Sequence, residues 1–204
     1  MLLHDNEIEA LFVDDHLNFY CGDDKGGVTC FSNGKLKYQI NIVEGVKSLF
    51  VENNLVYTLL NMDLSIHELR DNGKYIMKSS IPGKFPVTLF GKKEDTISAF
   101  IAILTRDGKG ITIVKNSSAE LFSTLTMKEN VHEMIINAMA GCGNILYSCD
   151  YAGVLKRLEV DGNELKELDE ISIESGCANC LALVDDKTVF VGSTDGSIKK
   201  IIFN

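Results

Sequence analysis

Hydrophobic and polar positions alternate along this chain in short runs that are typical of β-strands. One pattern recurs: an apolar run, a short polar turn, a second apolar run, a turn containing Gly or Asp, and a third alternating run. Clear copies begin at Ala10, Ser48 and Cys180, and looser copies begin near Val87 and Met134. We therefore predict that one unit of β-strands is repeated five times.

The third strand of each copy gives the spacing of the repeat. Its aligned apolar positions are Val28, Ile66, Ile111, Leu155 and Ile198, which are separated by 38, 45, 44 and 43 residues. Similar spacings with the same local pattern are typical of repeat architectures. Asn-Gly and Asp-Gly pairs then lead into a fourth run, and such pairs favour tight hairpin turns. Each unit is therefore predicted to be a four-stranded antiparallel meander.

These units predict an all-β fold. A single sheet of this kind cannot cover both of its apolar faces, whereas a radial arrangement packs each sheet against its neighbours. We expect a single β-propeller domain over residues 1–204, with about five four-stranded antiparallel blades. The blades are expected at residues 7–42, 43–83, 84–130, 131–176 and 177–204. The last blade has three strands, so either residues 1–4 close the ring or the chain is part of a larger propeller.

A family resemblance supports this fold. The segment Asp195–Ile201, with Gly192-Ser193 just before it, resembles the turn and third strand of the WD-repeat family of β-propellers. The hydrophobic residues at the place of the family tryptophan are Phe31, Leu69, Val114, Leu158 and Ile201. The chain has no Trp, no Trp-Asp pair and no Gly-His pair, so the hydrogen-bond tetrad that often locks a family blade cannot be carried over. The resemblance implies a scaffold for protein interactions.

Charge and composition narrow the function classes. The net charge of −9 disfavours nucleic acids and anionic membrane surfaces as partners. No apolar run approaches the roughly 20 residues of a transmembrane helix. The first residues, Met1–Asn6, turn acidic and do not resemble a secretory signal. We predict a cytoplasmic or nuclear protein that is not secreted, with reduced cysteines.

No motif in the sequence predicts catalysis, a metal site or a cofactor. The segment Gly192–Gly196 comes closest to a nucleophile elbow, but its serine stands one place early. Cys177 and Cys180 form a lone CxxC pair, whereas a zinc site commonly has two, so the cysteines are interpreted as buried free thiols. None of the histidines lies beside a plausible Ser or Cys nucleophile in sequence. Acidic residues recur at the turns, where Asp favours local hydrogen bonds.

The turns between second and third strands carry varied side chains and are the candidate partner-binding positions. They contribute Lys25, Asn61, Arg106, Tyr151 and Thr194. We expect a non-catalytic module that binds a protein or peptide through these loops, with Arg106 and Tyr151 as the main anchors. One alternative is a partial propeller that another chain completes by strand pairing, as a subunit of a larger complex. A second alternative is a hydrolase that uses carboxylates near the propeller axis.

Overall fold

The computed structural model is almost entirely β-sheet. It describes residues 6–42, 44–70, 73–92, 97–120, 122–174 and 176–203. Its nineteen strands form five separate antiparallel sheets, and one short 3-10 helix, η1 (Ser118–Glu120), lies between two of them. Four sheets have four strands, the last has three, and none closes on itself. The all-β prediction and the five antiparallel sheets are confirmed; the propeller and the single domain stay predictions, and the closing strand proposed at residues 1–4 lies outside the described residues.

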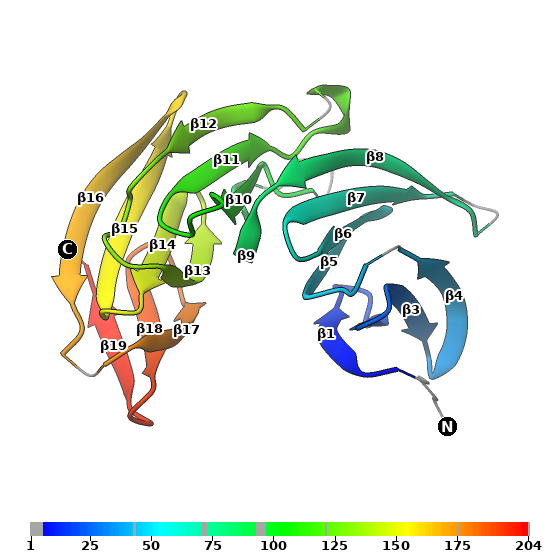
Figure 1. The fold of residues 1–204 in the computed structure, drawn as a ribbon, viewed down its shortest axis with the longest axis horizontal. Coiled ribbons are helices and arrows are strands. Elements are labelled where there is room, and N and C mark those ends of the chain that lie inside the picture. The colour runs from blue at the N-terminus through cyan, green and yellow to red at the C-terminus, as the bar shows by residue number, and fades with distance from the viewer. Residues whose placement is uncertain are drawn as a thin grey trace. The chain divides into compact units, whose positions relative to one another are not determined.

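The chain divides into two compact units, residues 1–85 and 86–204. The first unit contains two sheets, drawn in blue to green in Figure 1, whose strands pair in chain order. Sheet 1 consists of β1 (Ile8–Val13), β2 (Phe19–Asp23), β3 (Gly27–Ser32) and β4 (Lys35–Asn41). Sheet 2 consists of β5 (Ser48–Glu52), β6 (Leu55–Leu59), β7 (Asp63–Leu69) and β8 (Tyr75–Pro82). Apolar side chains of both sheets, including Val28 and Leu49, share one core.

The second unit contains the other three sheets, again with neighbouring strands adjacent in sequence. Sheet 3 consists of β9 (Lys84–Phe90), β10 (Phe100–Leu104), β11 (Ile111–Lys115) and β12 (Thr124–Lys128). Sheet 4 consists of β13 (Ile136–Cys142), β14 (Ile145–Asp150), β15 (Val154–Asp161) and β16 (Glu164–Ser172). Sheet 5 consists of β17 (Ala178–Leu183), β18 (Thr188–Ser193) and β19 (Ile198–Ile202).

Sheet 4 is packed on both of its faces. Leu146 belongs to a core shared with sheet 3, while Tyr147 and Leu155 belong to a core shared with sheet 5. Corresponding strands of neighbouring sheets lie against each other, with β12 beside β16 and β13 beside β17. A strand that is covered on both faces is rich in apolar residues, and all six residues of β14 are buried, including the polar Ser148 and Asp150.

The turn between the second and third strands has the same geometry in four of the sheets. In each, the backbone N–H of a glycine donates to the carbonyl oxygen three residues earlier. The pairs are Gly26 with Asp23 (3.2 Å), Gly108 with Thr105 (2.9 Å), Gly153 with Asp150 (3.0 Å) and Gly196 with Ser193 (3.0 Å). These glycines have φ of +77° to +91°, which an L-residue adopts at a cost. Sheet 2 has a tighter turn, in which the N–H of Leu60 donates to the oxygen of Asp63.

Candidate functional site

The five candidate partner-binding residues all lie in turns between second and third strands. In the first unit, Lys25 follows β2 and Asn61 follows β6. A single linker joins these two turns: the N–H of Val46 donates to the oxygen of Asp23 at 2.9 Å, and the N–H of Lys47 donates to Leu59 at 2.8 Å. The structure therefore connects the Lys25 and Asn61 turns at one end of sheets 1 and 2.

In the second unit, a loop joins the turn that carries Arg106 to the turn that carries Tyr151. This loop, residues 131–135, precedes β13. At its end, the N–H of Ile136 donates to Gly108 of the first turn at 2.8 Å. The N–H of Tyr151 in the second turn donates to the oxygen of Ile135 at 3.1 Å.

The Thr194 turn of sheet 5 is tied to the same end through the segment that follows β16. The N–H of Thr194 donates to the oxygen of Cys177 at 2.9 Å. The N–H of Ile173, at the start of this segment, donates to Gly153 in the sheet 4 turn at 2.7 Å. The turns with Arg106, Tyr151 and Thr194 therefore lie in series at one end of sheets 3 to 5, which we call the turn end of the second unit.

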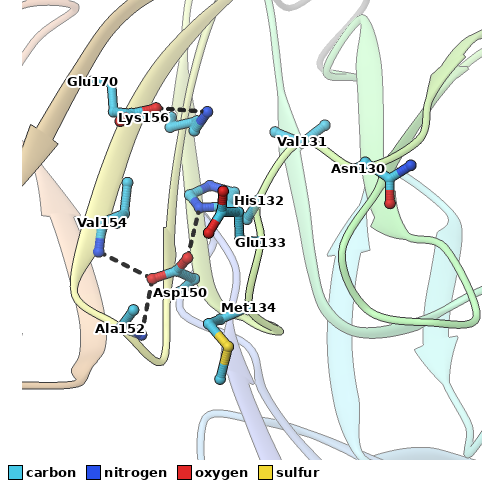
Figure 2. A pocket seen from close by; sticks show the side chains of 10 residues that line it. All are labelled: Asn130, Val131, His132, Glu133, Met134, Asp150, Ala152, Val154, Lys156 and Glu170. Carbon is cyan, nitrogen blue, oxygen red and sulfur yellow. Dashed lines mark hydrogen bonds and ion pairs between the residues drawn. The ribbon is translucent and has the colours of Figure 1, made fainter.

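A cavity of about 410 Å³ opens at this turn end on sheet 4 (Figure 2). It is lined by Asn130, Val131, His132, Glu133, Met134, Asp150, Ala152, Val154, Lys156 and Glu170. Three of these side chains are carboxylates and one is a lysine. Lys156 Nζ lies 2.8 Å from Glu170 Oε2 and 2.9 Å from Glu167 Oε2, so acidic groups already neutralise it.

A buried hydrogen-bond network forms one wall of the cavity. His132 Nδ1 lies 3.2 Å from Asp150 Oδ2, and His132 Nε2 lies 2.8 Å from Ser148 Oγ. Asp150 Oδ1 accepts hydrogen bonds from the backbone N–H of Ala152 (2.9 Å) and of Val154 (3.0 Å), as Figure 2 shows. Burial lowers the pKa of His132, and this outweighs the attraction of nearby Asp150. The neutral ring fits the network, with Nδ1–H donating to Asp150 and the Ser148 hydroxyl donating to Nε2.

This network has the order of contacts of a serine nucleophile, a histidine base and an orienting aspartate. Ser148, however, has no exposed surface and lies in β14, the strand that is covered on both faces. A substrate cannot reach its hydroxyl without separating the sheets. What the contacts achieve here is structural, because they join the loop before β13 to β14 and to the β14–β15 turn.

This network could not be predicted from a sequence motif. His132 lies 16 residues from Ser148 and 18 residues from Asp150, and no motif connects the three. One signal in the sequence pointed to part of this network. Asp150 stands directly before the turn between the second and third strands, as Asp23 does in sheet 1. Asp23 Oδ1 likewise accepts from the N–H of Lys25 at 2.9 Å and of Gly27 at 2.7 Å.

Two further turn carboxylates, Asp185 and Asp195, also accept hydrogen bonds from their own turns. Asp185 accepts from the N–H of Lys187 at 2.9 Å, and Asp195 accepts from that of Ser197 at 2.9 Å. Burial by itself would raise the pKa of Asp14, but hydrogen bonds from Asn18 and other neighbours hold it below its usual range. These contacts are the local turn contacts that the sequence predicts for Asp.

The cysteines differ from one another in exposure. Cys21 and Cys149 are buried, as predicted, and burial raises the pKa of Cys149 to about 12. The buried-thiol prediction is wrong for Cys180, which is exposed, and it holds only in part for Cys142 and Cys177, which are partly exposed. The described residues also contain no group of three or more His, Cys, Asp or Glu side chains placed to hold a metal ion.

The stability of the protein is expected to fall as the pH drops below about 6.5, the ordinary pKa of histidine. Burial lowers the pKa of both His132 and His67 in the folded state. Below 6.5 the unfolded chain therefore binds protons that the folded chain does not, and this favours unfolding until the lowered folded values are reached. Denaturant unfolding at pH 7.5 and 5.5 measures the difference.

The variant His132→Gln should weaken this pH dependence, since it removes one of the two groups. The exposed histidine variant His16→Gln is the control for the substitution itself, and it should retain more of the pH dependence than His132→Gln does. Equal stability of the unmodified protein at the two pH values would contradict the expectation.

The comparisons with known proteins provide evidence about the fold but not about the function. No protein-family model matches the chain, and no curated protein matches it. A solved structure of similar fold is that of the computationally designed Ika8 protein, with a TM-score of 0.64 and 16% sequence identity; the match covers 98% of this chain and 72% of the Ika8 chain. Among the described residues, no helix has the length and apolar character needed to cross a membrane. At this identity, the similarity to Ika8 shows a shared fold and carries no functional assignment.

Proposed function

We propose that this chain is a non-catalytic, WD-repeat-like β-propeller module that binds a protein or peptide partner. The propeller proposal is supported by the repeated turn and by the packing of sheet 4 between sheets 3 and 5, with corresponding strands adjacent. A radial arrangement extends this packing from one sheet to the next. The turns at one end of such sheets present varied side chains on a rigid frame.

The cavity at the turn end of the second unit is the observation that carries the binding proposal. Exposed side chains with large apolar surfaces lie in the cavity and next to it: Met134, which lines the cavity, is 48% exposed, and Tyr151, which stands between the lining residues Asp150 and Ala152, is 53% exposed. Tyrosine is among the residues that contribute most to binding when a partner covers them. Exposed apolar groups around a hollow that can accept a side chain are typical of a peptide-binding surface.

The charges in the cavity indicate the kind of partner. The cavity lining contains three carboxylates, Glu133, Asp150 and Glu170, against one lysine, and His132 is neutral near pH 7 because burial lowers its pKa. The cavity is therefore acidic overall, and an acidic hollow favours a basic guest. We propose that a lysine or arginine side chain of the partner enters the cavity, while neighbouring apolar residues of the partner contact Met134 and Tyr151.

The buried position of Ser148 supports the non-catalytic part of the proposal. Nucleophilic catalysis requires the hydroxyl to approach a substrate carbonyl, whereas Ser148 has no exposed surface. Every hydrogen-bonding atom of the His132 ring is also engaged inside the sheet. The network serves to position the loop that forms the cavity wall.

Screening a library of displayed peptides against the full chain tests this proposal. We expect the selected peptides to carry a lysine or arginine next to apolar residues. For such a peptide, Tyr151→Ala should weaken binding by about tenfold or more, because a covered tyrosine commonly contributes about 2 kcal/mol. Isothermal titration calorimetry measures the change.

Two methionines offer a matched control for this experiment. Met134 borders the cavity, whereas Met127 lies in β12 and is similarly exposed. Met134→Ala should weaken peptide binding, and Met127→Ala should leave it unchanged. If an Arg106→Ala, Tyr151→Ala double variant binds the selected peptides as well as the unmodified chain does, the turn end is not the binding surface.

A further inference from the structure

Sheet 5 differs from the other four sheets at its outer edge. In sheets 1 to 4 a fourth strand pairs with the third strand, whereas among the described residues sheet 5 ends at its third strand, β19 (Figure 1). The apolar position of the third strand is fully buried in the other sheets, at Val28, Ile66, Ile111 and Leu155. Its counterpart in β19, Ile198, is 75% exposed, and Ile202 on the same strand is 64% exposed. An edge strand with exposed isoleucines is a template for pairing with another strand.

Sheet 4 shows which residues a fourth strand places against a third strand of this type. There, Leu155 of β15 is paired with Ile171 of β16. The next two positions of β15 are basic and meet acids, since Lys156 is paired with Glu170 and Arg157 with Asp169. Both pairs form ion pairs, at 2.8 Å for Lys156 and 3.1 Å for Arg157.

The strand β19 repeats the β15 pattern in the same register. Ile198 is paired with Gly192 of β18, as Leu155 is paired with Cys149 of β14, so these positions correspond. The two residues after Ile198 are Lys199 and Lys200, in the places of Lys156 and Arg157. In the described parts of the chain, neither lysine forms an ion pair. The edge of β19 thus offers an apolar residue followed by two positive charges.

The turn before β19 provides an additional contact for an incoming strand. In sheets 1 and 4, the residue just after the fourth strand donates its N–H to the turn glycine: Ile42 to Gly26 and Ile173 to Gly153, both at 2.7 Å. The equivalent glycine of sheet 5 is Gly196. Within the described residues no atom lies within 4 Å of the position of a Cβ on Gly196, so the space is open on that side.

We propose that β19 binds an extended segment of a partner protein, which adds a fourth antiparallel strand to sheet 5. The segment carries an apolar residue opposite Ile198 and acidic residues opposite Lys199 and Lys200. Backbone hydrogen bonds supply the pairing, and the charges set the register. This site is at a sheet edge and is independent of the cavity proposed above, so either one can fail without the other.

A peptide copied from β16 is a suitable probe, because this strand already meets the same pattern in sheet 4. The probe is Glu164–Ile173, ELKELDEISI, added to the full chain. Hydrogen–deuterium exchange should show slower exchange of the β19 amides, Ile198–Ile202, when the peptide is present. A peptide in which Gln, Asn and Gln replace the acids of Glu167, Asp169 and Glu170 should bind at least tenfold more weakly.

A charge exchange isolates the two lysines. The Lys199→Glu, Lys200→Glu variant should bind the probe at least tenfold more weakly, and it should regain affinity for a probe with lysine in place of Asp169 and Glu170. The Lys35→Glu, Lys92→Glu variant changes the net charge equally at other exposed lysines and should bind the probe within twofold of the unmodified chain. If the lysine-containing probe binds this variant, the restored affinity shows that the Lys199→Glu, Lys200→Glu chain remains folded.

Several results would overturn the proposal. One is protection of β15 in place of β19, because the peptide would then be displacing β16 within sheet 4. Another is slow exchange of the β19 amides in the protein without peptide, at every protein concentration. A segment of the same chain would then already cover the edge. Protection that grows with protein concentration would identify a second copy of the chain as the occupant. Absence of any change at β19 would show that this edge does not accept a strand.

Discussion

Replacing His132 with alanine is expected to lower the free energy of unfolding by about 3 kcal/mol, from the loss of buried hydrogen bonds and the cavity that remains. The imidazole is buried between Ser148 and Asp150 and bonds to both. Its removal leaves the Ser148 hydroxyl and one carboxylate oxygen of Asp150 without this partner, in a part of sheet 4 that water reaches poorly. Urea unfolding followed by tyrosine fluorescence measures the change, since the chain has no tryptophan.

Two further variants separate the network from a general loss of packing. Ser148→Ala should cost less in the His132→Ala background than in the unmodified chain, because the bond between the two residues has already gone. His16→Ala removes an exposed histidine and should change the stability by less than about 0.5 kcal/mol. A cost below about 1 kcal/mol for His132→Ala would mean that the network does not hold the loop in place.

The features that depend on local sequence could be predicted. Strands such as β6 and β10 follow from short apolar runs, and the glycine turns follow from the need for positive φ at Gly153 and Gly196. The repeat spacing then gave the number of sheets. Each of these properties is determined by residues that are close together in the chain, and this is why the pattern of the sequence carries them.

The cavity and its buried network could not be predicted from the same pattern. They depend on how residues 131–135 fold over the neighbouring turn, and on a register shift between Ile136 and Ala138 that alternation does not reveal. The exposure of Cys180 was missed for a related reason. A lone CxxC pair favours free thiols, but it does not indicate which side of a strand a neighbouring sheet covers, and Cys180 of β17 is exposed.

The two proposed binding surfaces use different properties of the fold. The cavity is built from loops that the sheets hold in place, so its specificity depends on lining side chains such as Glu133 and Met134. The β19 edge offers backbone groups, so its specificity depends on register and on Lys199 and Lys200. A protein with both surfaces can hold one partner by a side chain and another by a strand.

Replacing Gly26 with alanine is expected to lower the free energy of unfolding by about 3 kcal/mol, which is more than the roughly 1 kcal/mol expected from positive φ alone. A Cβ at Gly26 would overlap the backbone carbonyl oxygen of Ile42, which no side-chain rotation relieves. The backbone would have to move, and the hydrogen bond from the Ile42 N–H to Gly26 would be lost. Thermal or urea unfolding of the full chain measures the change.

Gly196 provides a control for this prediction within the same turn type. Its φ of +83° is close to the +91° of Gly26, yet nothing among the described residues lies within 4 Å of its Cβ position. Gly196→Ala should therefore cost only about 1 kcal/mol, the strain of an L-residue at positive φ. The difference between the two variants measures the contact with the segment after the fourth strand, which sheet 1 has and sheet 5 lacks. If both variants lose the same free energy of unfolding, the contact between Gly26 and the segment after the fourth strand contributes nothing to stability.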